Sequence, residues 1–499
     1  MYNVVGQSLV LVLSLIAVRF IFRRLGNDVF GIIFFNITLT AVLTRVLELG
    51  ASSTIVREVS SAFESERAYV RDLVRTASFL YWAIGILLML FIWITAPLLV
   101  TNWINLTTID PNTAATMLRI LSVPALVALP RGLYTAMFRG RQRMGYNNAI
   151  DVGASIVQQF GILVVLLAGG SPYMVAGWIS ASAALAVLAY ILVASRLFGW
   201  RTLLPSFSSY VARRNLGFAG RMSLTSVASL VNTQANQVIV SKLLPIGEFG
   251  LFGFASSTVN RATLVTGAVA QAAFPSFSNL HRAHNHVGLI TQYRKLHDLV
   301  CYGTMPLFAG VCFAALPVYS YLFNNSAAWL LFIPTVLLAL GTYMNGTTTI
   351  PYILSVAMGK PDIGLKSNLW ALFILLPITV VLIVALGLVG AGLSWVAYNA
   401  WLYVYLVPRV TRECLQTATI AWFAHLGKAF AASFLIYGLA WLAIVVPTGY
   451  SLLGCVAAYI LATVAFAGAA LYLIGPDLKS TLRGLVPTVK RLVRPTPSR

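Results

Sequence analysis

The chain has 499 residues, of which 59% are hydrophobic and 9% are charged. A soluble domain carries about a quarter charged residues, so this composition excludes a soluble globular fold. The net charge of +21 would be compatible with a nucleic-acid partner. The basic residues, however, lie mostly in short loops between long apolar segments, which excludes nucleic acid and indicates a membrane topology.

Each long apolar segment has enough residues to cross a hydrocarbon core of about 30 Å as a helix. The sequence therefore predicts an all-α polytopic membrane protein with about fourteen transmembrane helices. In chain order, the predicted spans are 3–22, 29–49, 74–100, 113–137, 149–167, 174–195, 217–241, 249–275, 299–323, 327–357, 367–385, 391–408, 421–446 and 450–474.

Lys and Arg concentrate in alternate loops, as in the segment containing Arg139, Arg141 and Arg143. Short basic loops stay on the cytoplasmic side, so we expect both termini to be cytoplasmic and the protein to lie in a bacterial inner membrane. The first apolar segment lacks a basic start and a small-residue cleavage site, which favours a retained helix over a signal peptide.

Two halves of the chain share a repeated pattern of glycines. Gly31, in the segment leading into the second span, and Gly250, in the segment leading into the eighth, are 219 residues apart. Gly140 and Gly359, before the fifth and eleventh spans, keep the same offset. This register predicts two parallel six-helix repeats followed by two extra helices. The expected divisions are 1–212, 213–415, 416–475 for helices 13 and 14, and a basic cytoplasmic tail at 476–499.

Polar side chains within the spans predict a cationic binding cavity, because a buried charge in the membrane costs about 2.5–3.5 kcal/mol and is seldom placed there without a function. Arg261 is near the centre of the eighth predicted span, and helical spacing puts it on a polar face. The predicted substrate-binding residues are Arg19, Arg45, Arg131, Asn232, Asn236, Asn260 and Arg261. Structural roles stay open for three of them: Arg19 can reach the interface, Arg45 can pair with Glu48, and Arg131 can be engaged beside Pro130.

The only carboxylates expected within spans are Glu48 and Asp151, near the cytoplasmic ends. A cavity with arginines and without a deep carboxylate favours an anionic cargo over cation exchange. The sequence predicts no catalytic residue, no cofactor and no metal site, and the cluster of His281, His284 and His286 is interpreted as a solvated loop. The short outer loops argue against a membrane-embedded enzyme.

The layout resembles the polysaccharide transporters of the multidrug/oligosaccharidyl-lipid/polysaccharide exporter superfamily. The resemblance covers about the first 470 residues and rests on the helix arrangement and three local segments. These segments are the Arg24-Leu25-Gly26 turn into Phe30-Gly31, its counterpart from Lys242 to Gly250, and Ala273-Phe274-Pro275-Ser276 before a basic loop.

The resemblance implies two six-helix lobes around a central cavity that open alternately to the two sides. It also implies a polyprenyl-pyrophosphate-linked oligosaccharide as cargo, moved from the cytoplasmic to the outer leaflet for surface or exopolysaccharide assembly. In the branch that carries a peptidoglycan precursor, cavity arginines lie on the first, second and eighth helices, where Arg19, Arg45 and Arg261 stand here. Many members have an acidic residue in the seventh helix, where this chain has Asn236-Gln237.

Three alternatives remain at this point. The leading one is the lipid-linked oligosaccharide flippase, for which the expected partners are its cargo, membrane lipids, and a polysaccharide polymerase or glycosyltransferases of the same pathway. The second is a multidrug/cation antiporter of the same superfamily. The third is a membrane-embedded polysaccharide polymerase or acyltransferase.

Overall fold

A computed structural model describes residues 2–48, 51–62, 66–211, 213–214 and 234–481, and these residues form helices and no strand. Ten of the helices among the described residues are long and apolar enough to cross a membrane. Helix covers every predicted span within the described residues, so the all-α polytopic class is confirmed, whereas the total of fourteen stays a prediction. The described helices group into two compact units, Met1–Gly253 and Phe254–Arg499.

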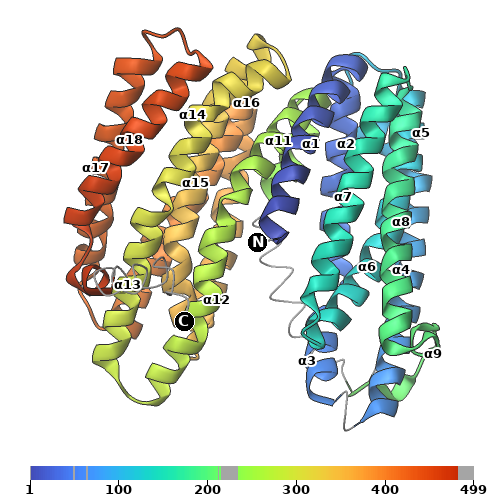
Figure 1. Ribbon diagram of the computed structural model, residues 1–499, viewed down its shortest axis with the longest axis horizontal. Coiled ribbons are helices and arrows are strands. Elements are labelled where there is room, and N and C mark those ends of the chain that lie inside the picture. Colours follow the sequence, from blue (N-terminus) through green and yellow to red (C-terminus); the bar gives the residue numbers. More distant parts are fainter. Residues whose placement is uncertain (1, 49–50, 63–65, 212, 215–233, 482–499) are drawn as a thin grey trace, which may run out of the picture. The chain divides into compact units, whose positions relative to one another are not determined.

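The first unit holds the helices up to the first half of α11 (Figure 1). In chain order they are α1 (Tyr2–Leu25), α2 (Asn27–Leu47), α3 (Ala51–Ala62), α4 (Arg67–Asn102), α5 (Pro111–Ile120), α6 (Ser122–Gly140), α7 (Met144–Leu167), α8 (Pro172–Phe198), α9 (Trp200–Leu203) and α11 (Ile246–Arg261). A core cluster rich in aromatic side chains joins α4, α6 and α8, with Tyr81, Tyr134 and Tyr190 each at most 3% exposed.

The start of α2 is tied to the loop between α4 and α5 by one buried carboxylate. Asp28 is 1% exposed and accepts hydrogen bonds from the backbone N–H groups of Thr107, Thr108 and Ile109 at 2.7, 2.6 and 3.1 Å. The Thr107 hydroxyl donates a fourth bond at 2.8 Å. A buried carboxylate is stable when its lone pairs are satisfied in this way, so Asp28 fixes this end of α2.

The glycines that define the predicted repeat contact each other where α2 meets α11. A Cβ on Gly250 would lie 2.6 Å from the Cα of Gly31, and one on Gly31 would lie 2.0 Å from the carbonyl oxygen of Ile246. Both distances are too short for a real side chain, so the two backbones can approach this closely only because both residues lack a Cβ.

The second unit holds the end of α11 and all later helices. They are α12 (Thr263–Arg282), α13 (His286–Gly303), α14 (Met305–Leu322), α15 (Asn325–Ala357), α16 (Asp362–Val410), α17 (Thr419–Ala440) and α18 (Leu452–Leu473). Within α16 the backbone leaves helical geometry at Gly387, with φ 56° and ψ −131°, so α16 is two helices joined at a kink. That kink lies between the predicted spans 367–385 and 391–408.

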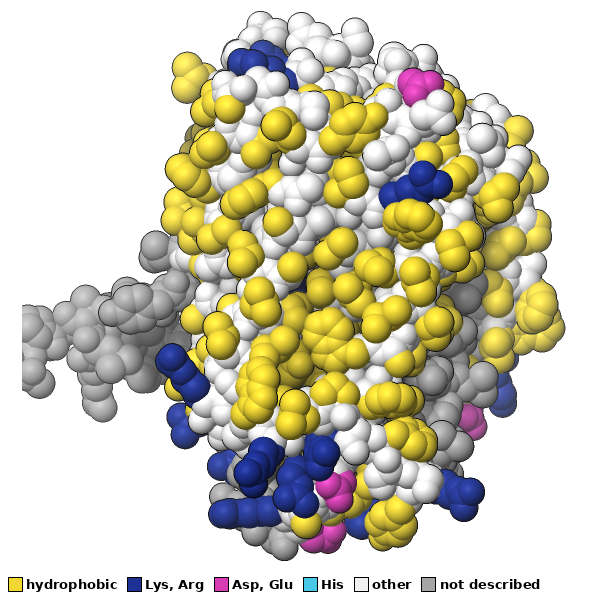
Figure 2. Space-filling model, turned by 90° about the vertical axis from the view of Figure 1, so that its right-hand side faces the viewer, with side chains coloured by type: hydrophobic (Ala, Val, Ile, Leu, Met, Phe, Trp, Pro, Cys, Tyr) yellow, Lys and Arg dark blue, Asp and Glu magenta, His cyan; other side chains and the backbone are white. Residues whose placement is uncertain are grey.

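The surface matches a membrane setting. Figure 2 shows hydrophobic side chains over the middle of one face and Lys and Arg gathered toward its lower end. Many of the large apolar residues are more than half exposed, including Leu87, Phe160 and Phe373. In water such a surface would aggregate, whereas in a bilayer these side chains face lipid.

Candidate functional site

A stripe of polar side chains runs along one face of α2. Asn36, Thr40 and Thr44 follow one another at steps of four residues, which places them on the same side of the helix. Asn36 is 3% exposed. The Asn36 Oδ1 and both threonine hydroxyls are buried and have no hydrogen-bond partner among the described residues. A buried polar atom without a partner costs about 1–3 kcal/mol, so the stripe is suited to a polar ligand or bound water.

Next to this stripe, α2 contacts the helical stretch 234–243, which carries the predicted residue Asn236. The Thr38 hydroxyl donates a hydrogen bond to Gln237 Oε1 at 3.3 Å. Asn236, the residue before Gln237, is half-buried. The structure thus brings amide and hydroxyl groups of two helices of the first unit together. Such groups both donate and accept hydrogen bonds, which matches the chemistry of sugar hydroxyls.

Arg45 follows the stripe directly, in the last turn of α2. Its side chain is exposed, and it forms no ion pair within the described part of the chain, so pairing with Glu48 does not occupy it. Arg19 is half-buried in the second half of α1. A guanidinium that no carboxylate neutralises can bind phosphate oxygens through its fork of N–H donors, and Arg45 meets this condition.

Arg131 on α6 has a carboxylate partner. Its Nη2 lies 2.6 Å from Asp151 Oδ1 on α7, and the Tyr190 hydroxyl on α8 donates to the same oxygen at 2.8 Å. The guanidinium also lies over the Tyr190 ring, 6.0 Å from its centroid. One carboxylate therefore links three helices, and the structure gives Arg131 a structural contact in addition to its predicted role.

The remaining predicted residues divide as follows. Asn260 and Arg261 are exposed and end α11, and α12 begins two residues later at Thr263. Helix therefore covers the predicted span 249–275 except at Ala262, whose N–H bonds to the Val259 carbonyl, so Arg261 lies beside a local break in the helix. Asn232 lies outside the described residues.

That Glu48 and Asp151 are the only carboxylates within spans stays a prediction. Asp298, which is 4% exposed, lies in the 37-residue helical stretch His286–Leu322 directly before the predicted span 299–323, and Asp28 lies in the first turn of α2 directly before the predicted span 29–49. Both carboxylates are buried at helix positions next to the predicted spans. Thr40 and Thr44 were missed as site residues, although their spacing from Asn36 was a readable signal.

The known proteins that this chain resembles indicate the class of protein to which it belongs. A model of a polysaccharide biosynthesis protein family matches residues 20–334. A curated protein of Shigella flexneri, "Putative O-antigen transporter", is 20% identical over 421 residues, covering 82% of this chain and 97% of that protein.

Two solved structures share the fold at low sequence identity. The lipid II flippase MurJ in an inward closed conformation has a TM-score of 0.66 and 14% identity, covering 94% of this chain and 98% of that one. An inward-facing multidrug resistance transporter of the MATE family also has a TM-score of 0.66, with 13% identity and coverage of 81% and 96%.

The fold, the membrane-facing surface and these relatives define a multi-pass membrane transporter rather than an enzyme. The chain belongs to the polysaccharide biosynthesis protein family, and it shares its fold with MurJ and the MATE transporter.

Proposed function

We propose that this transporter flips a polyprenyl-pyrophosphate-linked oligosaccharide from the cytoplasmic to the outer leaflet of the bacterial inner membrane. Movement occurs by alternating access and supplies surface or exopolysaccharide assembly. The O-antigen transporter relative supports a glycan cargo, and the fold shared with a lipid II flippase supports a lipid-linked one. The polymerase or glycosyltransferases of the same pathway are the proposed protein partners.

The observation that carries this proposal is that α2 bears both the polar stripe and, one residue beyond it in sequence, Arg45, which forms no ion pair among the described residues. Asn36 Oδ1 needs a hydrogen-bond donor, which a sugar hydroxyl supplies. Arg45, one residue beyond Thr44, is exposed and can bind an anion such as a pyrophosphate. One helix therefore presents both chemistries that such a lipid-linked sugar requires.

The proposed roles follow from these chemistries. Arg45, Arg19 and Arg261 hold the pyrophosphate, and Asn232, Asn236 and Asn260 contact the sugar with Asn36. Arginine suits the pyrophosphate because its charge does not change with pH and its donors match phosphate oxygens. Arg131 keeps its predicted place in this set, in addition to its contact with Asp151.

The test is transport of a fluorescent polyprenyl-pyrophosphate oligosaccharide in liposomes containing the purified protein. Loss of one charge-assisted contact removes about 1.5–3 kcal/mol, so Arg45→Gln and Arg261→Gln should each slow transport at least about tenfold. Arg282→Gln is the matched control, because Arg282 is an exposed arginine whose side chain bonds to the nearby Asn279 side chain.

Wild-type transport rates in both Arg45→Gln and Arg261→Gln would remove the proposed pyrophosphate site. Drug-driven proton flux without movement of the lipid-linked sugar would instead identify a multidrug/cation antiporter. Chain growth of the sugar in the liposomes would identify a polymerase.

A further inference from the structure

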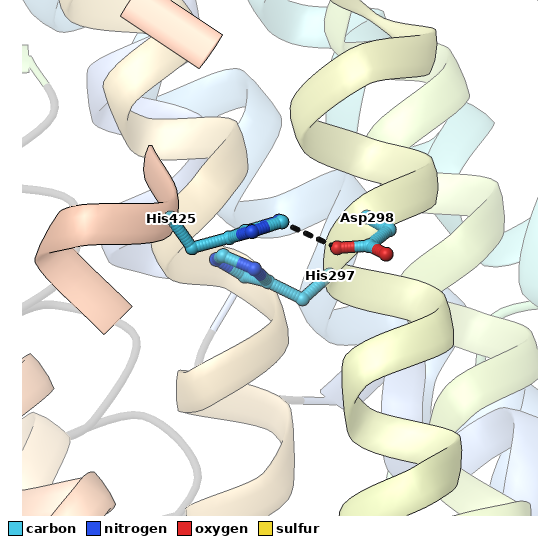
Figure 3. Close-up of side chains that lie close together, drawn as sticks. All are labelled: His297, Asp298 and His425. Carbon is cyan, nitrogen blue, oxygen red and sulfur yellow. Dashed lines mark ion pairs between the residues drawn. The ribbon is translucent and has the colours of Figure 1, made fainter. Parts of the chain in front are cut away.

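Two histidines and an aspartate that are far apart in sequence meet inside the second unit. His297 and Asp298 are consecutive on α13, and His425 approaches them from α17 (Figure 3). One ligand atom from each of the three residues lies within 4.8 Å of the other two. His297 is 3% exposed and Asp298 is 4% exposed, so the cluster is largely closed to solvent.

Neighbouring groups hold two of these side chains in place. Asp298 Oδ2 accepts a hydrogen bond from the backbone N–H of Gly475, just after α18, at 2.7 Å, which leaves Oδ1 directed to the histidines. The His297 ring stacks on Tyr293, with centroids 5.7 Å apart and 12° between the planes. The Tyr293 hydroxyl in turn accepts a bond from Trp422 Nε1 at 3.0 Å. Metal ligands are commonly oriented by such surrounding contacts.

The contact between His425 and Asp298 is close but poorly aligned. His425 Nε2 is 2.6 Å from Asp298 Oδ1, yet this nitrogen has no hydrogen bond of acceptable geometry with any described residue. The ring N–H therefore does not point at the oxygen. A nitrogen and an oxygen placed in this way can instead converge on a third atom.

A cavity of about 300 Å³ adjoins the cluster and is lined by all three residues. Arg294 and Asp477 line the same cavity, so its wall carries both signs of charge. It offers a cation a route to the cluster, and it has room for a water molecule as a further ligand.

We propose that His297, Asp298 and His425 bind a divalent transition-metal cation of the Zn²⁺ type, with water in the fourth position. Two imidazole nitrogens and one carboxylate oxygen favour such a cation over Mg²⁺ or Ca²⁺, which prefer oxygen ligands. Zn²⁺ with ligands at about 2.0–2.2 Å holds them about 3.3–3.5 Å apart, so small side-chain rotations complete the site. The bound ion links α13, α17 and the segment after α18, a function beyond cargo transport.

The test uses the full-length protein purified in detergent and treated with a chelator. Titration with Zn²⁺ followed by calorimetry should give one ion per chain, and Co²⁺ should give the visible absorption of a tetrahedral site. Zn²⁺ should also raise the thermal unfolding midpoint, because a ligand that binds only the folded state stabilises it. His425→Gln should weaken Zn²⁺ binding at least about tenfold and abolish the midpoint shift.

The matched control replaces His281, His284 and His286 with glutamine, since these exposed histidines lie at the end of α12, in the following turn and at the start of α13. This variant should bind Zn²⁺ as the wild type does. The proposal is overturned if the wild type takes up no stoichiometric Zn²⁺ or Co²⁺, if folded His425→Gln binds as tightly as the wild type, or if the triple control loses the site. Asp298→Asn retains an acceptor for Gly475 and gives a second variant should His425→Gln elute as an aggregate.

Discussion

At the scale of single residues, the arginines predicted from sequence divide by what surrounds them. Arg45 and Arg131 both stand in helices among apolar residues, and the sequence gives no reason to separate them. The structure separates them, because Asp151 and Tyr190 converge on Arg131 from two other helices, whereas Glu48 does not pair with Arg45. Pairing between residues on different helices depends on packing that local sequence does not encode.

The contact between Arg131 and Asp151 should be measurable as an interaction energy. Arg131→Gln and Asp151→Asn should each lower the thermal unfolding midpoint, and the double variant should lose less than the sum of the two. Hydrogen bonds between transmembrane helices contribute about 0.6 kcal/mol on average and exposed ion pairs about 0.2–1 kcal/mol, so we expect a coupling below about 1 kcal/mol. The measurement is a double-mutant cycle on the purified protein.

Strict additivity of the two losses would show that the 2.6 Å contact adds no stability. Tyr190→Phe is the control for the third partner, because it removes the bond to Asp151 and leaves the ion pair in place. Its effect should add to that of Arg131→Gln only in part, since both contacts share one carboxylate oxygen.

At the scale of elements, the meeting of α2 and α11 shows why glycines recur at a fixed interval. Gly31 and Gly250 were recognised from their spacing alone, and the structure places them against each other. Spacing predicted that the two positions are equivalent, but it did not predict their contact. The close backbone approach is a property of the packed pair, and neither helix shows it by itself.

Gly31→Ala should destabilise the protein, because the new Cβ would lie 2.0 Å from the Ile246 carbonyl oxygen and would force the backbones apart. Overpacking of this kind costs about 1–3 kcal/mol. Gly153→Ala on α7 should do the opposite, since a Cβ there meets nothing within 4 Å and alanine is favoured over glycine in a helix by about 1 kcal/mol. Thermal unfolding of both variants is the measurement, and equal effects would contradict the packing described here.

At the scale of the whole molecule, orientation follows from charge. The predicted topology places the turn before α13 in the cytoplasm and the start of α5 outside the cell, because the first is flanked by basic residues and the second is not. Helix packing within each compact unit does not determine which side of the membrane each loop faces. The orientation of the protein in the membrane therefore remains a prediction from the sequence.

Cysteine labelling tests the orientation. With a membrane-impermeant maleimide, Asn112→Cys should react in intact cells, and Val287→Cys, 77% exposed in α13, should react only after the membrane is opened. The chain's own cysteines give little background, since Cys301, Cys414 and Cys455 are buried and Cys312 is partly buried. The reverse pattern would invert the topology and place both termini outside.

The sequence alone determined the class and the helix positions within the described residues, because apolar length, helical spacing and charge asymmetry are local properties of the chain. The arginine and amide residues of the candidate site stay predictions. Only the tertiary structure decided which polar groups are satisfied. It gave Arg131 a partner and left three polar atoms of the α2 stripe without a partner among the described residues. It also brought His425 to His297 and Asp298 across more than a hundred residues. Each of these outcomes depends on which faces of the helices contact one another, and the packing of the helices in the folded protein decides those contacts.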